Sequence, residues 1–384
     1  MERGDEIELT IESVAFGGAG VGRHGKMVVF VPFTVDEDTA SVKITAVKKR
    51  FATAELKTLR APSPFRVAPR CAAYTRCGAC SYQHISYDHQ IVLKSRQVRD
   101  ALDRIGRFDA IAIEDMIPSP ETYGYRGKAD FHVATGIGKK RSVGFAAWAT
   151  NRIVDLERCE IVHESINEAL SLLRQAGSPA GRCSLWSAPV EDVSESRIMR
   201  RVKSREMLVP RDGFFQANLY LTDTLVDVVE NFCSLSGTET VLDGYCGSGL
   251  FSLFLAPSCS RIYGIDVEGD AVHCAEQNLS RAGIKSAVFW AGDIAYILRD
   301  RFIRDSIPVD LALVDPPRVG LEPETLAALA RVNPRKIVYV SCNPTTLARD
   351  LRAFTRFGYN IKQTRPLDMF PQTSHIETVV LLER

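Results

Sequence analysis

Alternating apolar and polar positions near the N-terminus predict a small β structure. Ile7–Ile11 and Ala40–Val47 alternate, whereas Met27–Phe33 is a continuous apolar run, typical of a buried strand. Between the first two of these segments along the chain, Ala15–Gly25 is rich in glycine and predicts a loop with tight turns. This order predicts a five-stranded barrel of the oligonucleotide-binding (OB) type at residues 1–60. Because the glycine loop precedes a strand and not a helix, a dinucleotide fingerprint is not expected here.

The composition changes at residues 61–80, which are rich in proline and then in cysteine and mark a boundary. A helix is predicted from about Tyr87 to Arg107. Its exposed positions are expected to include Lys94, Arg96, Arg99 and Arg104. Residues 123–210 predict mixed strands and one helix near Glu164–Gln175. We therefore expect a central α+β domain at residues 61–212.

Strand–helix alternation begins at about residue 213. The strand candidates are Val241–Asp243, Arg261–Asp266, Ala287–Phe289, Val309–Val314, Lys336–Ser341 and Thr378–Leu382. Helical stretches separate most of them, as in a doubly wound, mostly parallel sheet. The predicted fold class is α/β, with a Rossmann-like domain at residues 213–384 behind the barrel and the central α+β domain.

Composition and charge narrow the class of protein. Of 384 residues, 45% are apolar and 25% are charged, a globular mixture. No apolar run approaches the roughly 20 residues of a membrane helix, and Met1–Glu6 is acidic where a signal peptide would be basic and then apolar. We expect a cytoplasmic monomer with no membrane segment and no obligate protein partner. Residues 41–108 carry a net charge of +10 against −9 for the rest, which indicates either a phosphate-binding surface or a solvated face. Residues 197–205 form a second basic cluster.

The turn after the first strand of the predicted sheet reads Asp-Gly-Tyr-Cys-Gly-Ser-Gly. Gly247 and Gly249 let the backbone approach a ligand at the carboxyl end of that strand. Asp266 ends the next strand, where an acid accepts hydrogen bonds from ribose hydroxyls. Asp293 and Asp315 follow the third and fourth strands, so four loops at one sheet edge offer polar groups to a nucleoside cofactor. A glycine pair alone would fit a simple tight turn. The motif resembles the S-adenosylmethionine loop of class I methyltransferases more than a dinucleotide GxGxxG.

Two residues at the same predicted edge are candidates for catalysis. Cys342 follows the fifth strand and precedes an Asn-Pro turn and a predicted helix at Thr345–Phe354. A cysteine is commonly a small core residue, but a helix N-terminus lowers the pKa of a thiol and favours the nucleophilic thiolate. Glu377 opens the last apolar strand. A carboxylate beside a dry core can have a raised pKa and serve as a general base, although alone it is more typical of a solvated strand end.

The segment Phe214–Asn218, Phe-Phe-Gln-Ala-Asn, opens the last domain and has two readings. Its aromatics could be core residues before a helix. Alternatively, one ring could stack on an extruded base while the amides bond the base or the cofactor.

Four of the ten cysteines form the pattern C-x5-C-x2-C followed by a distant fourth: Cys71, Cys77, Cys80 and Cys159. Four thiolates can hold tetrahedral zinc or an iron–sulfur cluster. Zinc sites usually pair their ligands two and two, so three clustered cysteines and one distant one favour a cluster with four irons. Zinc remains open. The other cysteines outside the two sites are expected to be core thiols.

The chain resembles the RumA/TrmA family of RNA uracil-5-methyltransferases along its whole length, nearest to the rRNA-modifying members. The resemblance is carried by Phe-Phe-Gln-Ala-Asn, Asp-x-x-Cys-Gly-x-Gly, Asp-Pro-Pro-Arg, Ser-Cys-Asn-Pro-x-Thr-Leu-Ala-Arg-Asp and Asp-Met-Phe-Pro-x-Thr-x-His-Ile-Glu, in the family order. It implies a TRAM domain at residues 1–60 and a [4Fe–4S] cluster on the four cysteines. It also implies Cys342 as nucleophile and Glu377 as base. The cofactor positions it implies are Gln216, Tyr245, Asp266, Asp293 and Asp315. Gly244 stands where the family commonly has a larger apolar residue, and Asp266 where Glu is usual.

The resemblance implies 5-methyluridine formation in RNA, more in 23S rRNA than in tRNA. In this hypothesis Cys342 adds to carbon 6 of a flipped uracil, carbon 5 takes the methyl group, and Glu377 removes the carbon 5 proton. Two alternatives stay open: an RNA cytosine-5-methyltransferase and a non-catalytic RNA-binding iron–sulfur protein.

Overall fold

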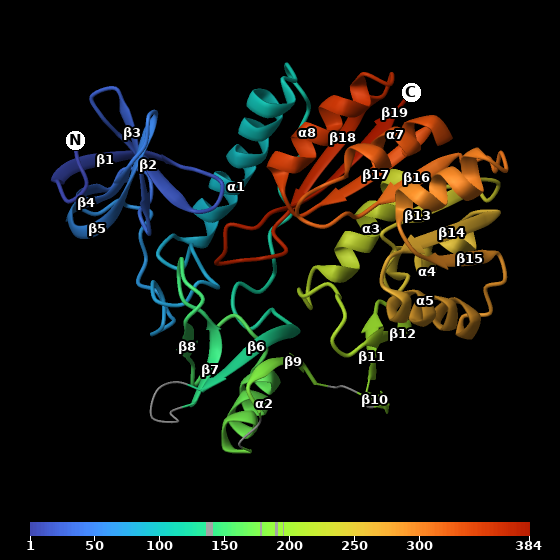
Figure 1. Ribbon diagram of the computed structural model, residues 1–384, viewed down its shortest axis with the longest axis horizontal. Helices are drawn as coiled ribbons and strands as arrows, with labels where there is room; N and C mark the ends of the chain where they lie inside the picture. Colours follow the sequence, from blue (N-terminus) through green and yellow to red (C-terminus); the bar gives the residue numbers. More distant parts are fainter. Residues whose placement is uncertain (136–140, 177–178, 189–190, 195) are drawn as a thin grey trace. The chain divides into compact units, whose positions relative to one another are not determined.

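The computed structural model describes residues 1–135, 141–176, 179–188, 191–194 and 196–384 (Figure 1). By their contacts these residues form two compact units. Unit 1 comprises Met1–Gln97, Glu121–Leu185 and Phe370–His375, and unit 2 comprises Val98–Pro120, Trp186–Met369 and Ile376–Arg384. The predicted three-domain division at residues 60 and 212 stays a prediction.

Unit 1 begins with a closed barrel, blue in Figure 1, in the order β1-β2-β3-β5-β4, and the predicted five-stranded barrel is confirmed. Its strands are β1 (Glu6–Val14), β2 (Ala19–His24), β3 (Met27–Pro32), β4 (Thr39–Val47) and β5 (Phe51–Ala61). Alternate side chains such as Ile11, Val29 and Val42 are buried in its core. The loop predicted at 15–25 is wrong in part, because residues 16–18 and Gly25 form turns but β2 occupies Ala19–His24 between them. A Cβ at Gly20 would lie 2.0 Å from the Thr34 hydroxyl, so β2 needs glycine where it passes this side chain.

The remainder of unit 1 surrounds the cysteine-rich segment. Helix α1 (Tyr87–Ala101) continues as a π-helical turn at Leu102–Gly106, close to the predicted helix, and its last residues lie in unit 2. A four-stranded sheet has the order β8-β7-β6-β9. Its strands are β6 (Lys128–Thr135), β7 (Arg141–Ala146), β8 (Ile153–Asp155) and β9 (Gly181–Trp186). The helix α2 (Glu164–Gln175) lies between β8 and β9 along the chain. The hydrophobic core of this part of unit 1 includes Phe131, Tyr125 and Ile166.

Unit 2 contains a seven-stranded sheet in the order β15-β14-β13-β16-β17-β19-β18. Its strands are β13 (Thr240–Gly244), β14 (Arg261–Asp266), β15 (Ala287–Ala291), β16 (Leu311–Val314), β17 (Lys336–Ser341), β18 (Asn360–Leu367) and β19 (Glu377–Glu383). The first five of these are parallel, β19 is antiparallel to β17, and β18 is antiparallel to β19. The six predicted strands are present, whereas β18 was not predicted. A second sheet joins β10 (Glu191–Ser194), β11 (Arg197–Val202) and β12 (Arg205–Pro210).

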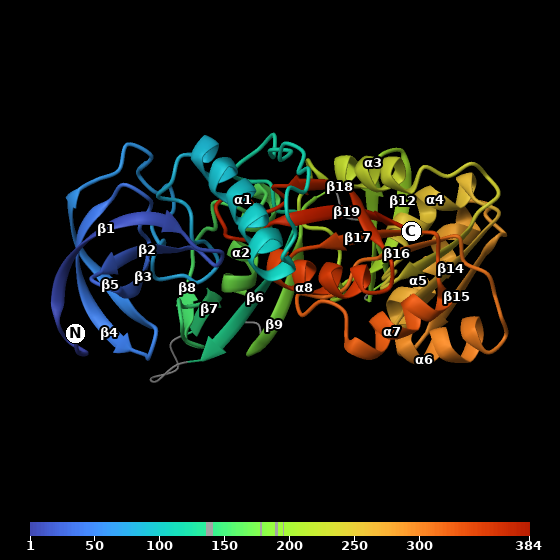
Figure 2. The ribbon, with the colours of Figure 1, turned by 90° about the horizontal axis from the view of Figure 1, so that it is seen from above.

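Helices cover both faces of the large sheet (Figure 2), with α3 and α4 on one face and α6 and α7 on the other. They are α3 (Thr222–Cys233), α4 (Leu250–Leu255), α5 (Gly269–Arg281), α6 (Ile294–Ile297), α7 (Pro323–Val332) and α8 (Pro344–Thr355). Helix α5 contacts α4, and α8 contacts α7. The α/β fold class is therefore confirmed. Within the described ranges, no helix is long and apolar enough to cross a membrane.

Candidate functional site

The pairing of β17 with β19 brings the two candidate catalytic residues together. Ser341 pairs with Thr378 at the end of this antiparallel ladder, so Cys342 and Glu377 are the next residues along the two strands. Both lie at the sheet edge where the parallel strands end. Because β19 runs antiparallel to β17, its first residue, Glu377, lies at the same edge of the sheet as the carboxyl ends of the parallel strands.

The environment of the thiol opposes its ionisation. Burial, and then the charges of Glu377 and Asp315, raise the pKa of the Cys342 thiol to about 12. The Arg318 guanidinium and the backbone of Cys342 act in the opposite direction but are outweighed. At neutral pH the Cys342 thiol is therefore protonated.

Helix α8 does not offset the raised pKa of the Cys342 thiol. Pro344 at its start has no N–H, and the Asn343 side chain accepts a hydrogen bond from Thr345 N at 3.0 Å. The expectation that the helix lowers the pKa of the Cys342 thiol is therefore wrong.

Two carboxyl groups, those of Glu377 and Asp315, interact electrostatically with the thiol. Burial, and then the charge of Asp315, raises the pKa of Glu377 well above its usual value. Burial also raises the pKa of Asp315 to about 7, with further contributions from Asp243 and Asp266. Glu377 is only 3% exposed, so the raised pKa expected for this carboxylate is confirmed. Such a group is protonated when isolated and is a strong base once it has ionised.

The loop after β13 has the shape expected of a cofactor loop. Gly247 N donates to Asp266 Oδ2 at 2.8 Å, and Glu268 N donates to Asp266 Oδ1 at 2.9 Å. Asp266 therefore joins the first two loops of the edge, a contribution that the sequence analysis did not include. Gly249 has φ of +78°, and a Cβ there would lie 3.0 Å from Ala275 of α5, so both its conformation and the helix packing require glycine.

The other predicted cofactor residues are placed as follows. Asp293 accepts a hydrogen bond from Tyr296 N at 2.7 Å and thereby begins α6. Tyr245 has φ of 65°, and its pKa is raised to about 12, first by burial. Gln216 is buried, with 8% exposure, whereas Phe214 is 75% exposed. The sequence placed Phe214 either in the core or against a base, and its exposure excludes the core.

Two residues at this edge were not predicted as functional. Asp243 is fully buried; its Oδ2 accepts hydrogen bonds from Ser252 N and Oγ, whereas its Oδ1 has no partner among the described residues. Burial raises the pKa of Asp243 to about 7. Arg318 is the residue whose charge opposes the raised pKa values of Cys342 and Glu377. Two features of the sequence could have indicated these residues: Asp243 is a charged residue at the end of a buried strand, and Arg318 is the arginine of Asp-Pro-Pro-Arg.

The four patterned cysteines of unit 1 line one small cavity, together with Tyr74, Gln83 and Glu160. They are Cys71, Cys77, Cys80 and Cys159, and none forms a disulfide. Burial raises the pKa of Cys159 to about 11, and burial followed by the charges of the other three thiols raises that of Cys80. Among the described residues, no group of three or more His, Cys, Asp or Glu could hold a metal ion. This finding supports neither a zinc ion nor an iron–sulfur cluster at these thiols.

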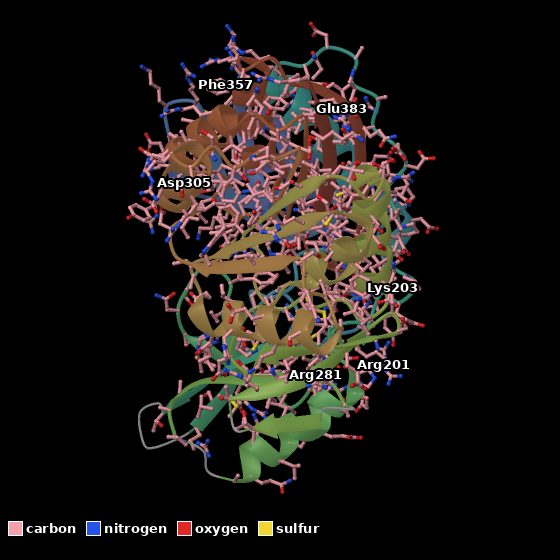
Figure 3. The ribbon with its side chains drawn as sticks, turned by 90° about the vertical axis from the view of Figure 1, so that its right-hand side faces the viewer. Arg201, Lys203, Arg281, Asp305, Phe357 and Glu383 are labelled. Atoms are coloured by element: carbon pink, nitrogen blue, oxygen red, sulfur yellow. The ribbon has the colours of Figure 1, made fainter. Side chains whose placement is uncertain are left out.

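The basic cluster on β11 and β12 is largely satisfied within unit 2. Arg200 donates to Ser187 O at 2.8 Å and lies over the Trp186 ring. Lys203 donates to Glu230 at 2.6 Å. Arg201, labelled with Lys203 in Figure 3, has a side chain 73% exposed. Only part of this cluster is therefore available to phosphate.

A sheet of this order, with a glycine loop after its first strand and acids after the next ones, defines an α/β enzyme that binds a nucleoside cofactor. Residues 195–384 match the family model described as tRNA (Uracil-5-)-methyltransferase, and residues 1–57 match the TRAM domain. The chain belongs to the family of S-adenosylmethionine-dependent RNA uracil-5-methyltransferases. It is an RNA methyltransferase, and S-adenosylmethionine is its methyl donor.

Relatives resemble this chain over nearly their full lengths. An uncharacterized RNA methyltransferase of Halalkalibacterium halodurans is 30% identical, over 100% of this chain and 97% of that protein. Another, from Synechocystis, is 29% identical over 100% and 96%. A solved structure, Pyrococcus abyssi tRNA (uracil-54, C5)-methyltransferase in complex with S-adenosyl-L-homocysteine, is 25% identical with a TM-score of 0.73, covering 97% of this chain and 100% of that one.

Proposed function

We propose that the protein methylates carbon 5 of a uridine in 23S rRNA through a covalent bond between Cys342 and the uracil. The observation that carries the proposal is the register of β17 and β19, which sets Cys342 beside Glu377 at the edge of the cofactor loops. This reaction needs a thiol as nucleophile, a carboxylate beside it as base, and a binding site for the methyl donor next to both.

S-adenosylmethionine supplies an electrophilic methyl group when bound. The residues proposed to hold it are Gln216, Tyr245, Gly247, Gly249, Asp266, Asp293 and Asp315. The fit rests on the Asp266–Gly247 bond, which shapes the loop, and on the buried Asp243 oxygen that has no partner among the described residues. The target uracil must leave its stack to reach the thiol, and the ring of Phe214, which is exposed, is the proposed stacking partner of a base.

The proposed chemistry balances as follows. Carbon 5 of uracil is too weak a nucleophile on its own, so the Cys342 thiol loses its proton and its sulfur bonds to carbon 6, leaving an enolate. Asp315, with a pKa of about 7, hydrogen bonds to the base. After carbon 5 has taken the methyl group, Glu377 removes the carbon 5 proton. The carbon–sulfur bond then breaks, and the departing thiolate takes the carbon 5 proton back from Glu377. The proton that Cys342 first gave to water is the one proton that the turnover releases.

We propose that Cys71, Cys77, Cys80 and Cys159 hold a [4Fe–4S] cluster. Four cysteine thiols around one cavity are a suitable donor set. Side-chain amides fix the backbone on both sides of that cavity, because Cys71 N donates to Gln83 Oε1 at 3.0 Å and Cys159 N to Asn167 Oδ1 at 2.9 Å. A cluster bound by four cysteines leaves no iron open, so its role is structural.

A tRNA uridine is the second candidate substrate. It is favoured by the solved Pyrococcus abyssi structure, which is named as a tRNA (uracil-54, C5)-methyltransferase. The rRNA proposal is supported by the combination of the TRAM domain with the cysteine pocket. That the enzyme acts as a monomer in the cytoplasm stays a prediction.

The test supplies labelled S-adenosylmethionine with unmodified 23S rRNA and tRNA transcripts in separate reactions, followed by digestion to nucleosides. Labelled 5-methyluridine from rRNA alone is the expected result. Label from tRNA alone would identify tRNA as the substrate in place of rRNA. Label in 5-methylcytidine would identify cytosine as the target base in place of uracil. No transfer by protein with its iron intact would leave the non-catalytic RNA-binding alternative.

A further inference from the structure

The segment Phe370–His375 belongs to unit 1, although the residues on both sides of it belong to unit 2. The chain leaves unit 2 after Met369 and returns at Ile376, one residue before Glu377. The contacts that hold this segment therefore act on the chain directly before the strand that carries the proposed base.

Helix α1 holds the segment with two buried side chains. Gln372 N donates to Gln90 Oε1 at 3.0 Å, and Gln90 Nε2 donates to Gln372 Oε1 at 3.1 Å. Lys94 Nζ donates to Phe370 O at 3.0 Å. Gln90 and Lys94 are four residues apart, so they share one face of the helix. Lys94 is 0% exposed, and its predicted exposure is therefore wrong.

The cysteine-rich loop holds the same segment from its backbone. Ser81 N and Tyr82 N, the two residues after Cys80, donate to Gln372 O at 3.1 and 2.9 Å. The Tyr125 hydroxyl donates to Pro371 O at 2.9 Å. Together with the Lys94 bond, the carbonyls of three successive residues of the segment all accept hydrogen bonds from unit 1.

These contacts impose an unusual conformation at Gln372. Its φ is 67°, in the left-handed region, and it is 3% exposed. A residue other than glycine holds such a conformation only when its surroundings fix it. Gln90 forms hydrogen bonds with both the main chain and the side chain of Gln372, so it contacts this residue at two points.

We propose that Gln90 is a positioning residue for proton removal by Glu377. By holding the left-handed turn at Gln372, it fixes the chain that enters β19 and thereby the carboxyl group of Glu377. This inference rests on the proposed role of Glu377 as base. Methyl transfer needs Cys342 and the methyl donor, whereas release of the product needs Glu377, so loosening the turn slows release and spares methyl transfer.

The test compares two methionine substitutions in the same helix. Gln90→Met fills a similar volume and removes the bonds to Gln372, together with those that Gln90 Nε2 donates to Ile85 O at 2.8 Å and to Tyr82 O at 3.2 Å. Gln97→Met is the matched control, because Gln97 is also buried, and its Nε2 donates at 3.0 Å to Val14 O and at 2.8 Å to the Tyr82 hydroxyl. Neither bond of Gln97 involves the segment 370–375.

The measurement is a single turnover of the holoenzyme with labelled RNA and S-adenosylmethionine. Methyl transfer is followed in the digested RNA, and the covalent protein–RNA adduct is followed on denaturing gels. For Gln90→Met we expect methyl transfer within about 3-fold of wild type, and adduct decay slowed by roughly 10- to 100-fold, the cost of a small misplacement of a reacting group. Gln97→Met is expected to behave as wild type.

The outcomes separate this inference from the proposed function. Glu377→Gln is run in parallel and should accumulate adduct; if it does not, the base assignment fails and the inference fails with it. If Glu377→Gln accumulates adduct but Gln90→Met does not, only the positioning role is overturned. Equal accumulation in Gln90→Met and Gln97→Met would also overturn it, as a general effect of disturbing the helix.

Should Gln90→Met not fold, Gln90→Glu replaces it, because it keeps the acceptor for Gln372 N and loses the donors. Adduct decay between the rates of wild type and Glu377→Gln is then expected, and decay at the wild-type rate overturns the positioning role.

Discussion

Three thiols of the cysteine pocket in unit 1, those of Cys77, Cys80 and Cys159, and the thiol of Cys342 in unit 2 have raised pKa values for different reasons. In the cysteine pocket, burial acts together with the charges of neighbouring thiols. At Cys342, burial acts together with two carboxyl groups, while Arg318 opposes them. Sulfur surrounded by sulfur suits an iron cluster, whereas one sulfur among carboxyls suits a nucleophile whose proton is removed only during reaction. A raised thiol pKa therefore does not identify a role; the neighbours do.

The largest expected effect separates the two groups by activity. Cys342→Ala should lower turnover by about 10⁴-fold or more, because no covalent bond to carbon 6 can form. The iron content and the thermal unfolding of this variant should match wild type. Activity above a few per cent would contradict the nucleophile assignment and remove the contrast with the cysteine pocket.

The second expected effect separates them by stability. Cys80→Ser should abolish iron binding and lower the free energy of unfolding by about 4 kcal/mol or more, since a bound cluster is part of the folded structure. Iron analysis and thermal unfolding measure this change. Cys183→Ser is the matched control in unit 1, because Cys183 does not line the cavity. Unchanged iron content in Cys80→Ser would contradict the ligand assignment.

The third expected effect concerns pH. Because the pKa of Cys342 is raised to about 12, its thiol stays protonated through neutral pH, and only the thiolate is alkylated. Alkylation by iodoacetamide, followed by mass spectrometry of the Cys342 peptide, should rise about tenfold for each pH unit from 7 to 10. A plateau by about pH 8 would show that the environment does not suppress ionisation.

The smallest expected effect tests the opposing charge. Arg318 lowers the pKa of the Cys342 thiol, so Arg318→Ala should raise that pKa and slow alkylation at fixed pH by about threefold. Added salt should shrink the difference, because Arg318 is exposed. Arg318→Lys keeps the charge and should stay near the wild-type rate. Faster alkylation in Arg318→Ala would reverse the assigned sign.

Strong local patterns predicted most elements of the fold. Strands such as Lys336–Ser341 are apolar runs that need burial on both faces, and helix α2 matches its predicted bounds. Strand β2 was missed because Ala-Gly-Val-Gly-Arg-His has glycines where apolar side chains would alternate. Strand β18 was missed because Asn-Ile-Lys-Gln-Thr-Arg is mostly polar, as an edge strand can be.

The features that sequence could not predict depend on contacts between distant parts of the chain. Lys94 was placed on the exposed face of its helix, yet its partner Phe370 lies 276 residues away. The pKa of Cys342 depends on side chains from the ends of β16 and β17 and the start of β19. Motif order indicated which residues meet, but the sign of the pKa change followed from burial that only the folded structure shows.

The unit that holds the barrel and the cysteine pocket is discontinuous along the chain, and this has a consequence for synthesis. A ribosome releases residues 1–97 before residues 370–375, so Gln372, one of the partners of Gln90, and Phe370, one of the partners of Lys94, emerge only later. Until then a buried lysine and glutamine lack acceptors that they have in the finished protein. The N-terminal part of unit 1 therefore stays incomplete until residues 370–375 have left the ribosome.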